Sequence, residues 1–107
     1  NGNIIATISN NNNVKGIEYD ANSNKLFGTY WNGSQEIFTS LDLSTNTFSN
    51  ISSLSGVQSL ASGVSTFDSN SGRYFISTNL GITIIDKENG NIIATISNNN
   101  NVKGIEF

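Results

Sequence analysis

The sequence contains neither cysteine nor histidine. Without cysteine the chain can form no disulfide and no thiolate metal site, and without histidine it lacks the commonest general base and metal ligand. Charged residues make up 12% of the 107 residues, against about 25% in an average domain, and asparagine, serine and threonine take their place. We therefore predict a non-enzymatic protein with no catalytic residues, no metal site and no cofactor.

Basic residues are also few, and the formal net charge is −3. A nucleic-acid partner would require a stripe of positive charge that neutralises a row of phosphates. The five basic residues are instead scattered along the chain, at Lys15, Lys25, Arg73, Lys87 and Lys103. No apolar run approaches the ~18 residues that a membrane-spanning helix needs. The sequence therefore predicts no nucleic-acid partner and no membrane insertion.

The chain repeats itself at two levels. Residues 1–19 recur 88 residues later as 89–107, and the only difference is Tyr19 in place of Phe107. Inside this repeat, Tyr19–Phe27 matches Phe67–Phe75, so that the inner period averages 44 residues. Such repetition is typical of a tandem array. We expect either a fragment of an array or an engineered unit with overlapping ends.

Short apolar runs rich in Ile, Phe, Tyr and Thr alternate with turn signals, and no window has helical periodicity, so the sequence predicts an all-β fold. Four strands in each inner repeat of this length are typical of a β-propeller blade. The expected strands are Asn3–Ile8, Gly16–Tyr19, Lys25–Tyr30, Glu36–Leu41, Thr47–Ile51, Gly63–Phe67, Arg73–Ser77, Ile82–Ile85, Asn91–Ile96 and Gly104–Phe107.

Four expected turns begin with Asp and end with Asn or Gly. Asn24 and Gly72 suit the left-handed conformation that closes such a hairpin. The Asp-x-Asn pattern is also similar to the start of a calcium loop, but position 12 of such a loop requires Glu and is occupied here by Trp31 and Asn79. The sequence therefore favours plain hairpin turns, at Asp20–Asn24, Asp42–Asn46, Asp68–Gly72 and Asp86–Gly90.

The segment Ile82–Ile96, ITIIDKENGNIIATI, resembles the YVTN-type β-propeller repeat. Gly16–Asp20 followed by Lys25–Phe27 is similar to the second half of that repeat. The chain departs from the family's name-giving motif, which Gly28–Trp31 and Ile76–Asn79 match only in part. The resemblance implies a propeller of a surface or secreted protein, and hence an extracellular or cell-surface location.

In propeller order the chain is a two-blade unit over residues 1–107. Residues 1–15 hold the outer strand of a preceding blade, 16–62 the first blade, 63–101 the second, and 102–107 the inner strand of the next. Two blades cannot close a ring, and isolated blades leave faces and edges exposed. We expect homo-oligomerisation by a head-to-tail contact, with a trimer giving six blades or a tetramer eight. The alternative is an excerpt from a longer array.

Tyr30, Trp31 and Asn32 form the most suggestive ligand-binding motif, because two aromatic rings followed by an amide suit a sugar. The alternative is that Trp31 packs between blades, as large aromatic residues often do. Glu18 and Glu106 lie on innermost strands, where copies around the axis attract a cation or simply line a solvated channel. The predicted role is a scaffold or interaction module with a protein or glycan partner, and the alternative is a lectin-like carbohydrate-binding propeller using Tyr30 and Trp31.

Overall fold

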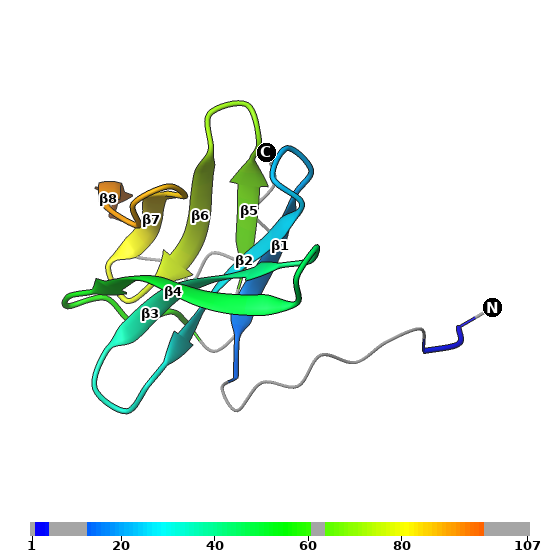
Figure 1. Ribbon diagram of the computed structural model, residues 1–107. Helices are drawn as coiled ribbons and strands as arrows, with labels where there is room; N and C mark the ends of the chain where they lie inside the picture. The colour runs from blue at the N-terminus through cyan, green and yellow to red at the C-terminus, as the bar shows by residue number, and fades with distance from the viewer. Residues whose placement is uncertain (1, 5–12, 61–63, 98–107) are drawn as a thin grey trace.

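The computed structural model describes residues 2–4, 13–60 and 64–97, and every regular element in these ranges is a β-strand (Figure 1). The strands form two antiparallel sheets of four, each in chain order, which confirms the all-β prediction. No helix in these ranges is long and apolar enough to cross a membrane. Sheet 1 holds β1 (Lys15–Asp20), β2 (Lys25–Trp31), β3 (Glu36–Asp42) and β4 (Thr47–Leu54), and sheet 2 holds β5 (Ser65–Asp68), β6 (Arg73–Thr78), β7 (Gly81–Asp86) and β8 (Ile92–Ile96).

Eight of the ten expected strands coincide with these elements to within a few residues. Sheet 1 begins at Lys15, one residue before the predicted start of the first blade. Of the expected strand Asn3–Ile8, only the first two residues are described, and they belong to no strand. The rest of that strand, the strand Gly104–Phe107 and the whole predicted segment 102–107 lie outside the described residues.

In all four Asp turns the Asp carboxylate accepts a hydrogen bond from the backbone N–H two residues later. In the β1–β2 turn the backbone oxygen of Asp20 accepts a hydrogen bond from the Asn24 N–H at 2.9 Å, and its carboxylate accepts one from the Asn22 N–H at 3.1 Å. Asp68 accepts the corresponding pair of bonds in the β5–β6 turn. The closing residues all have positive φ, which confirms the predicted left-handed positions at Asn24, Asn46, Gly72 and Gly90.

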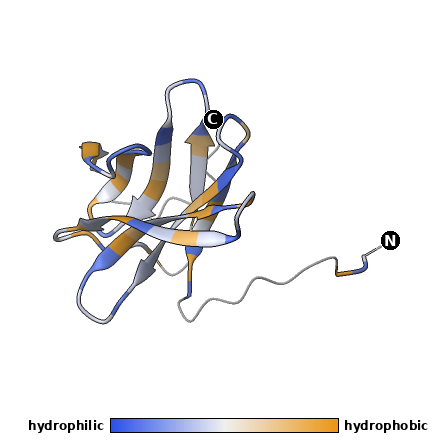
Figure 2. Ribbon diagram, viewed as in Figure 1, coloured by the Kyte–Doolittle hydropathy of each residue, from blue (hydrophilic) through white to orange (hydrophobic). Residues whose placement is uncertain are grey.

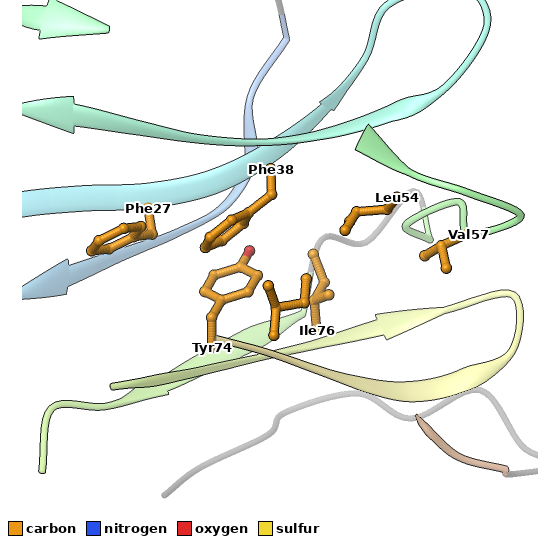
Figure 3. Packing of buried hydrophobic residues seen from close by; sticks show 7 residues of the cluster. Phe27, Phe38, Leu54, Val57, Tyr74 and Ile76 are labelled. Atoms are coloured by element: carbon orange, nitrogen blue, oxygen red, sulfur yellow. The ribbon is translucent and has the colours of Figure 1, made fainter. Parts of the chain in front are cut away.

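The main apolar core lies between the two sheets (Figure 3). Phe38 of β3 stacks on Phe27 of β2 with ring centroids 5.6 Å apart, and its other neighbour is Tyr74 of β6 at 5.2 Å. Tyr74 and Phe38 are both fully buried. The complete cluster is Phe27, Phe38, Leu54, Val57, Tyr74, Ile76 and Ile85.

Polar contacts also join the sheets. The Tyr74 hydroxyl donates to the Gly16 carbonyl at 2.6 Å, and Lys87 Nζ donates to Asp20 Oδ2 at 2.6 Å. Between strands of different sheets, β1 and β5 approach each other most extensively. The sheets therefore meet along their first strands, and the Ser52 hydroxyl of β4 also donates to the Gly90 carbonyl in the β7–β8 turn at 2.8 Å.

The two sheets stack front to back. In sheet 2, one cross-strand row faces sheet 1, and Tyr74 and Ile85 in it are fully buried. The internal repeat gives sheet 1 an equivalent row with the same pairings. This row faces away from sheet 2, because its member Leu26 is next in sequence to Phe27, whose side chain points into the core between the sheets. We call this side of each sheet its row face and the opposite side its reverse face. The rows are Tyr19, Leu26, Leu41 and Phe48 in sheet 1 and Phe67, Tyr74, Ile85 and Ile92 in sheet 2.

Candidate functional site

An open hollow of ≈ 240 Å³ lies where β2, β4 and β6 end. Trp31 forms one wall, and the buried side chains of Leu54 and Val57 lie at its base. The segment after β4 and the turn after β6 complete it, so both sheets contribute. Its lining residues are Trp31, Ser34, Gln35, Leu54, Gly56, Val57, Gln58 and Asn79.

The structure separates the three residues of the predicted sugar-binding motif. Trp31 remains 45% exposed and lines the hollow, rather than packing fully between the sheets. Tyr30, the preceding residue in β2, is only 6% exposed, and its hydroxyl donates to Asn50 Oδ1 at 3.1 Å. Asn32 Oδ1 accepts the backbone N–H groups of residues 34 and 35, both at 2.8 Å, and so holds the β2–β3 turn. Of the three, only Trp31 presents its side chain to the hollow.

Asn79 completes the hollow from the other sheet. In the internal repeat Asn79 occupies the position of Trp31, so equivalent residues of the two sheets meet at one site. Asn79 Oδ1 accepts the Gln58 N–H at 2.9 Å, and the Asn79 N–H donates to the Gln58 carbonyl at 3.0 Å. This pair fixes the segment after β4 against the end of β6.

A buried carboxylate, which no motif in the sequence marks, anchors the same segment at the base of the hollow. Glu36 is 1% exposed, and it lies opposite both Trp31 and Leu54 in sheet 1. Its carboxylate accepts the Ser59 N–H at 3.2 Å and the Ser59 hydroxyl at 2.9 Å. Because a buried charge requires such hydrogen bonds, Glu36 ties the segment carrying Gln58 to the base of the hollow.

The other two candidate sites have structural explanations. Glu18 lies on β1, where its carboxylate accepts the Ser65 hydroxyl of β5 at 2.7 Å and thereby contributes to the contact between sheets. Glu106 lies outside the described residues. The carboxylate of Asp20 is engaged by its own turn and by Lys87, which confirms the hairpin interpretation of that motif.

The pKa of Asp20 reflects this environment. Burial raises the pKa of this carboxyl, but hydrogen bonds from Lys87, Ser23 and the Asn22 N–H outweigh burial and lower it below its ordinary value of 3.8. Burial likewise raises the pKa of the Tyr74 phenol, so that its hydroxyl remains a donor to the Gly16 carbonyl. Both groups therefore support the contact between the sheets over the neutral pH range.

Apolar residues are interspersed along the strands of both sheets (Figure 2), and some of them are exposed on the outer faces of the two-sheet stack. On the row face of sheet 1, Tyr19 and Phe48 are exposed. On the reverse face of sheet 2, Ile96 of the edge strand β8 is 55% exposed, and Ile82, its partner on β7, is half-buried. Apolar residues gathered on a sheet face mark a surface that contacts something else.

Comparison with protein-family models, with curated proteins and with solved structures gave no match. The resemblance to the YVTN-type repeat therefore stays a prediction.

Proposed function

We propose that this chain is a two-blade β-propeller unit of the YVTN-like kind, which assembles with copies of itself into a closed ring and serves as a non-enzymatic scaffold or interaction module. The observation that carries this proposal is the front-to-back stacking of the two sheets. The reverse face of sheet 1 contacts the row face of sheet 2, so the contact joins two different surfaces. Such a heterologous contact continues from copy to copy instead of ending at a dimer.

The two outer faces of the stack correspond to the two that are already joined. On the reverse face of sheet 2, the half-buried Ile82 occupies the position that Phe38 fills in the core between the sheets. The row face of sheet 1 offers the exposed Tyr19 and Phe48, at the two ends of its row, as the counterpart of the Phe67 row. Burying a large apolar side chain stabilises an assembly by about 1.5–3 kcal/mol, so a few such residues suffice to favour association.

The shape of the stack favours a ring over a filament. We infer that each sheet is rotated relative to the next about an axis near its first strand, because β1 and β5 make the most extensive contact between strands of different sheets. Repeating that rotation from sheet to sheet closes a ring after a fixed number of sheets, and propellers form closed rings of about four to eight blades. With two sheets in each chain, a trimer gives six blades and a tetramer gives eight.

Light scattering on a sizing column tests the assembly. We expect a single species of three or four times the 11.5 kDa chain mass. Phe48→Glu blocks the row face of sheet 1 and Ile84→Glu blocks the reverse face of sheet 2, and each variant alone should be a monomer because a buried carboxylate without a partner opposes association. Leu80→Glu changes an apolar residue that is more exposed than Phe48 and lies in the β6–β7 turn, on neither face, and it should leave the oligomer intact.

Mixing the two blocked variants identifies the kind of contact. Phe48→Glu leaves the reverse face of sheet 2 intact, and Ile84→Glu leaves the row face of sheet 1 intact. These two faces can contact each other, so an equimolar mixture should form a dimer. That dimer also shows that both variants are folded, which circular dichroism checks independently. A monomeric wild-type chain would overturn the proposal, and so would a Phe48→Glu or Ile84→Glu chain that dimerises by itself, because it would use one face twice.

A further inference from the structure

We propose that the hollow at Trp31 binds one ring of a neutral carbohydrate. All eight lining residues belong to a single chain, so this site does not depend on the ring proposed above. The indole of Trp31 provides an exposed flat apolar wall, which suits the face of a pyranose ring where C–H groups are gathered. The polar rim then has to recognise hydroxyl groups.

The rim has the chemistry for that task. Ser34, Gln35 and Gln58 offer a hydroxyl and two amides, and within the described part of the chain their side chains form no hydrogen bond. Amide and hydroxyl groups both donate and accept, as sugar hydroxyls do. Sites that bind small molecules typically combine a mostly apolar wall with a few such polar groups.

Charge and size narrow the class of ligand. None of the lining residues is charged, so nothing in the hollow would compensate a phosphate, a sulfate or a uronic acid. Its volume of ≈ 240 Å³ lies below the roughly 300–1,000 Å³ of pockets that enclose a drug-sized molecule. The hollow therefore fits one sugar ring, and its open side leaves room for the rest of a glycan.

The construction of the site explains why it occurs once in each chain. Trp31 and Asn79 occupy equivalent positions in the two sheets, and only the segment after β4 brings Gln58 between them. The Glu36–Ser59 and Asn79–Gln58 contacts hold that segment in place before any ligand arrives. A preformed hollow of this kind binds without the cost of ordering its own walls.

Fluorescence titration tests the inference directly, because Trp31 is the only tryptophan of the chain. The probes are the methyl glycosides of glucose, galactose, mannose and N-acetylglucosamine, with glucuronic acid and inorganic phosphate as charged comparisons. We expect a saturable change in Trp31 emission with at least one neutral glycoside, with a dissociation constant on the order of 1 mM, as befits a single small ring, and none with the charged compounds.

Two variants assign the effect to the hollow. Gln58→Ala removes a rim amide and keeps the fluorescent reporter, and it should weaken binding about tenfold, as the loss of one hydrogen bond predicts. Asn91→Ala removes an exposed amide beside the β7–β8 turn, at the opposite end of the sheets, and should leave binding unchanged. Absence of saturable binding to all four glycosides, or equal loss in both variants, would overturn the inference. The monomeric Phe48→Glu chain should still bind, so failure of the ring and failure of the sugar site are distinguishable.

Discussion

The two sheets carry the same cross-strand row, yet only sheet 2 buries it against the other sheet. The row of sheet 2 lies in the contact between the two sheets, which we call the joint, and Tyr74 and Ile85 are inaccessible to solvent there. The row of sheet 1 faces outward, and its end residues Tyr19 and Phe48 remain exposed. Near-identical patterns thus meet different surroundings because, in the stack of the two described sheets, one face of each kind lies on the outside.

The polar contacts differ more than the apolar ones. Within the joint, Lys87, Tyr74 and Ser65 each bond to sheet 1. At the corresponding positions of sheet 1, the internal repeat places Leu43, Leu26 and Ile17, which cannot form such bonds. A contact through the outward faces would therefore depend mainly on apolar burial. The comparison indicates a joint fixed by directional bonds inside the chain, whereas the proposed contact between chains would be more easily reversed.

Truncating one phenylalanine on each side of sheet 1 should separate the two surfaces most clearly. Phe38→Ala empties the joint and should reduce the free energy of unfolding by about 4 kcal/mol, because a fully buried ring is lost and a cavity remains. Phe48→Ala removes an exposed ring from the row face and should cost the isolated chain under about 1 kcal/mol. Urea unfolding at low protein concentration measures both. Equal losses would mean that the row face is as well packed as the joint.

Gly16 should be the most sensitive backbone position of the joint. Its φ is +63°, and a Cβ there would collide with the Tyr74 hydroxyl and the Ile76 side chain, so Gly16→Ala should cost about 3 kcal/mol. Gly56 has a similar φ of +72° but open space around it, so Gly56→Ala should cost only the strain of about 1–2 kcal/mol. Urea unfolding measures both losses of stability, and the difference between them is the cost of the steric collision at Gly16. Equal losses would show that Tyr74 and Ile76 can move aside.

The Lys87–Asp20 pair predicts a dependence on pH. Because the pKa of Asp20 is lowered in the folded chain, its contribution to stability is present above its ordinary value of 3.8 and is lost as the pH falls through the lower folded value. Asp20→Asn should therefore destabilise the chain by about 2 kcal/mol near pH 6, and the deficit should shrink below pH 3.8.

Asp68→Asn is the matched control for this pair. Asp68 occupies the same turn position in sheet 2, where its carboxylate accepts hydrogen bonds from its own turn. A further sheet stacked in the same way would place the repeat equivalent of Lys87 beside Asp68, but that equivalent is Leu43, which carries no charge. Thermal unfolding across pH 2–7 should show a smaller loss for Asp68→Asn, from the turn hydrogen bonds alone, of about 1 kcal/mol. An Asp20→Asn deficit that persists unchanged at pH 2 would mean that the ion pair is not its source.

The strands and turns were predictable because their signals are local. Alternating apolar residues and the Asp-to-Asn or Asp-to-Gly turns fix the hairpins within ten residues of sequence. Which face of each sheet packs against the other sheet was not predictable from the sequence. Both faces carry apolar residues, such as Leu26 on one and Phe27 on the other, so either face could have been the inner one. Only part of the hollow was predictable from the sequence. The sequence marked Trp31 as a candidate binding residue, but Gln58 and Asn79, which complete the hollow, come together only through long-range contacts.

The smallest of these effects should come from single hydroxyl groups. Tyr74→Phe removes the donor to the Gly16 carbonyl, which joins the sheets at 2.6 Å, and should cost about 1.5 kcal/mol because that carbonyl loses its partner from sheet 2. Tyr30→Phe removes a bond within sheet 1, to Asn50 at 3.1 Å, and should cost under about 1 kcal/mol. Hydrogen exchange on β1 and β5 gives the sharper readout, because Tyr74→Phe should speed exchange on both strands and Tyr30→Phe on neither. If Tyr74→Phe left β1 as protected as before, apolar packing alone would be holding the two sheets together.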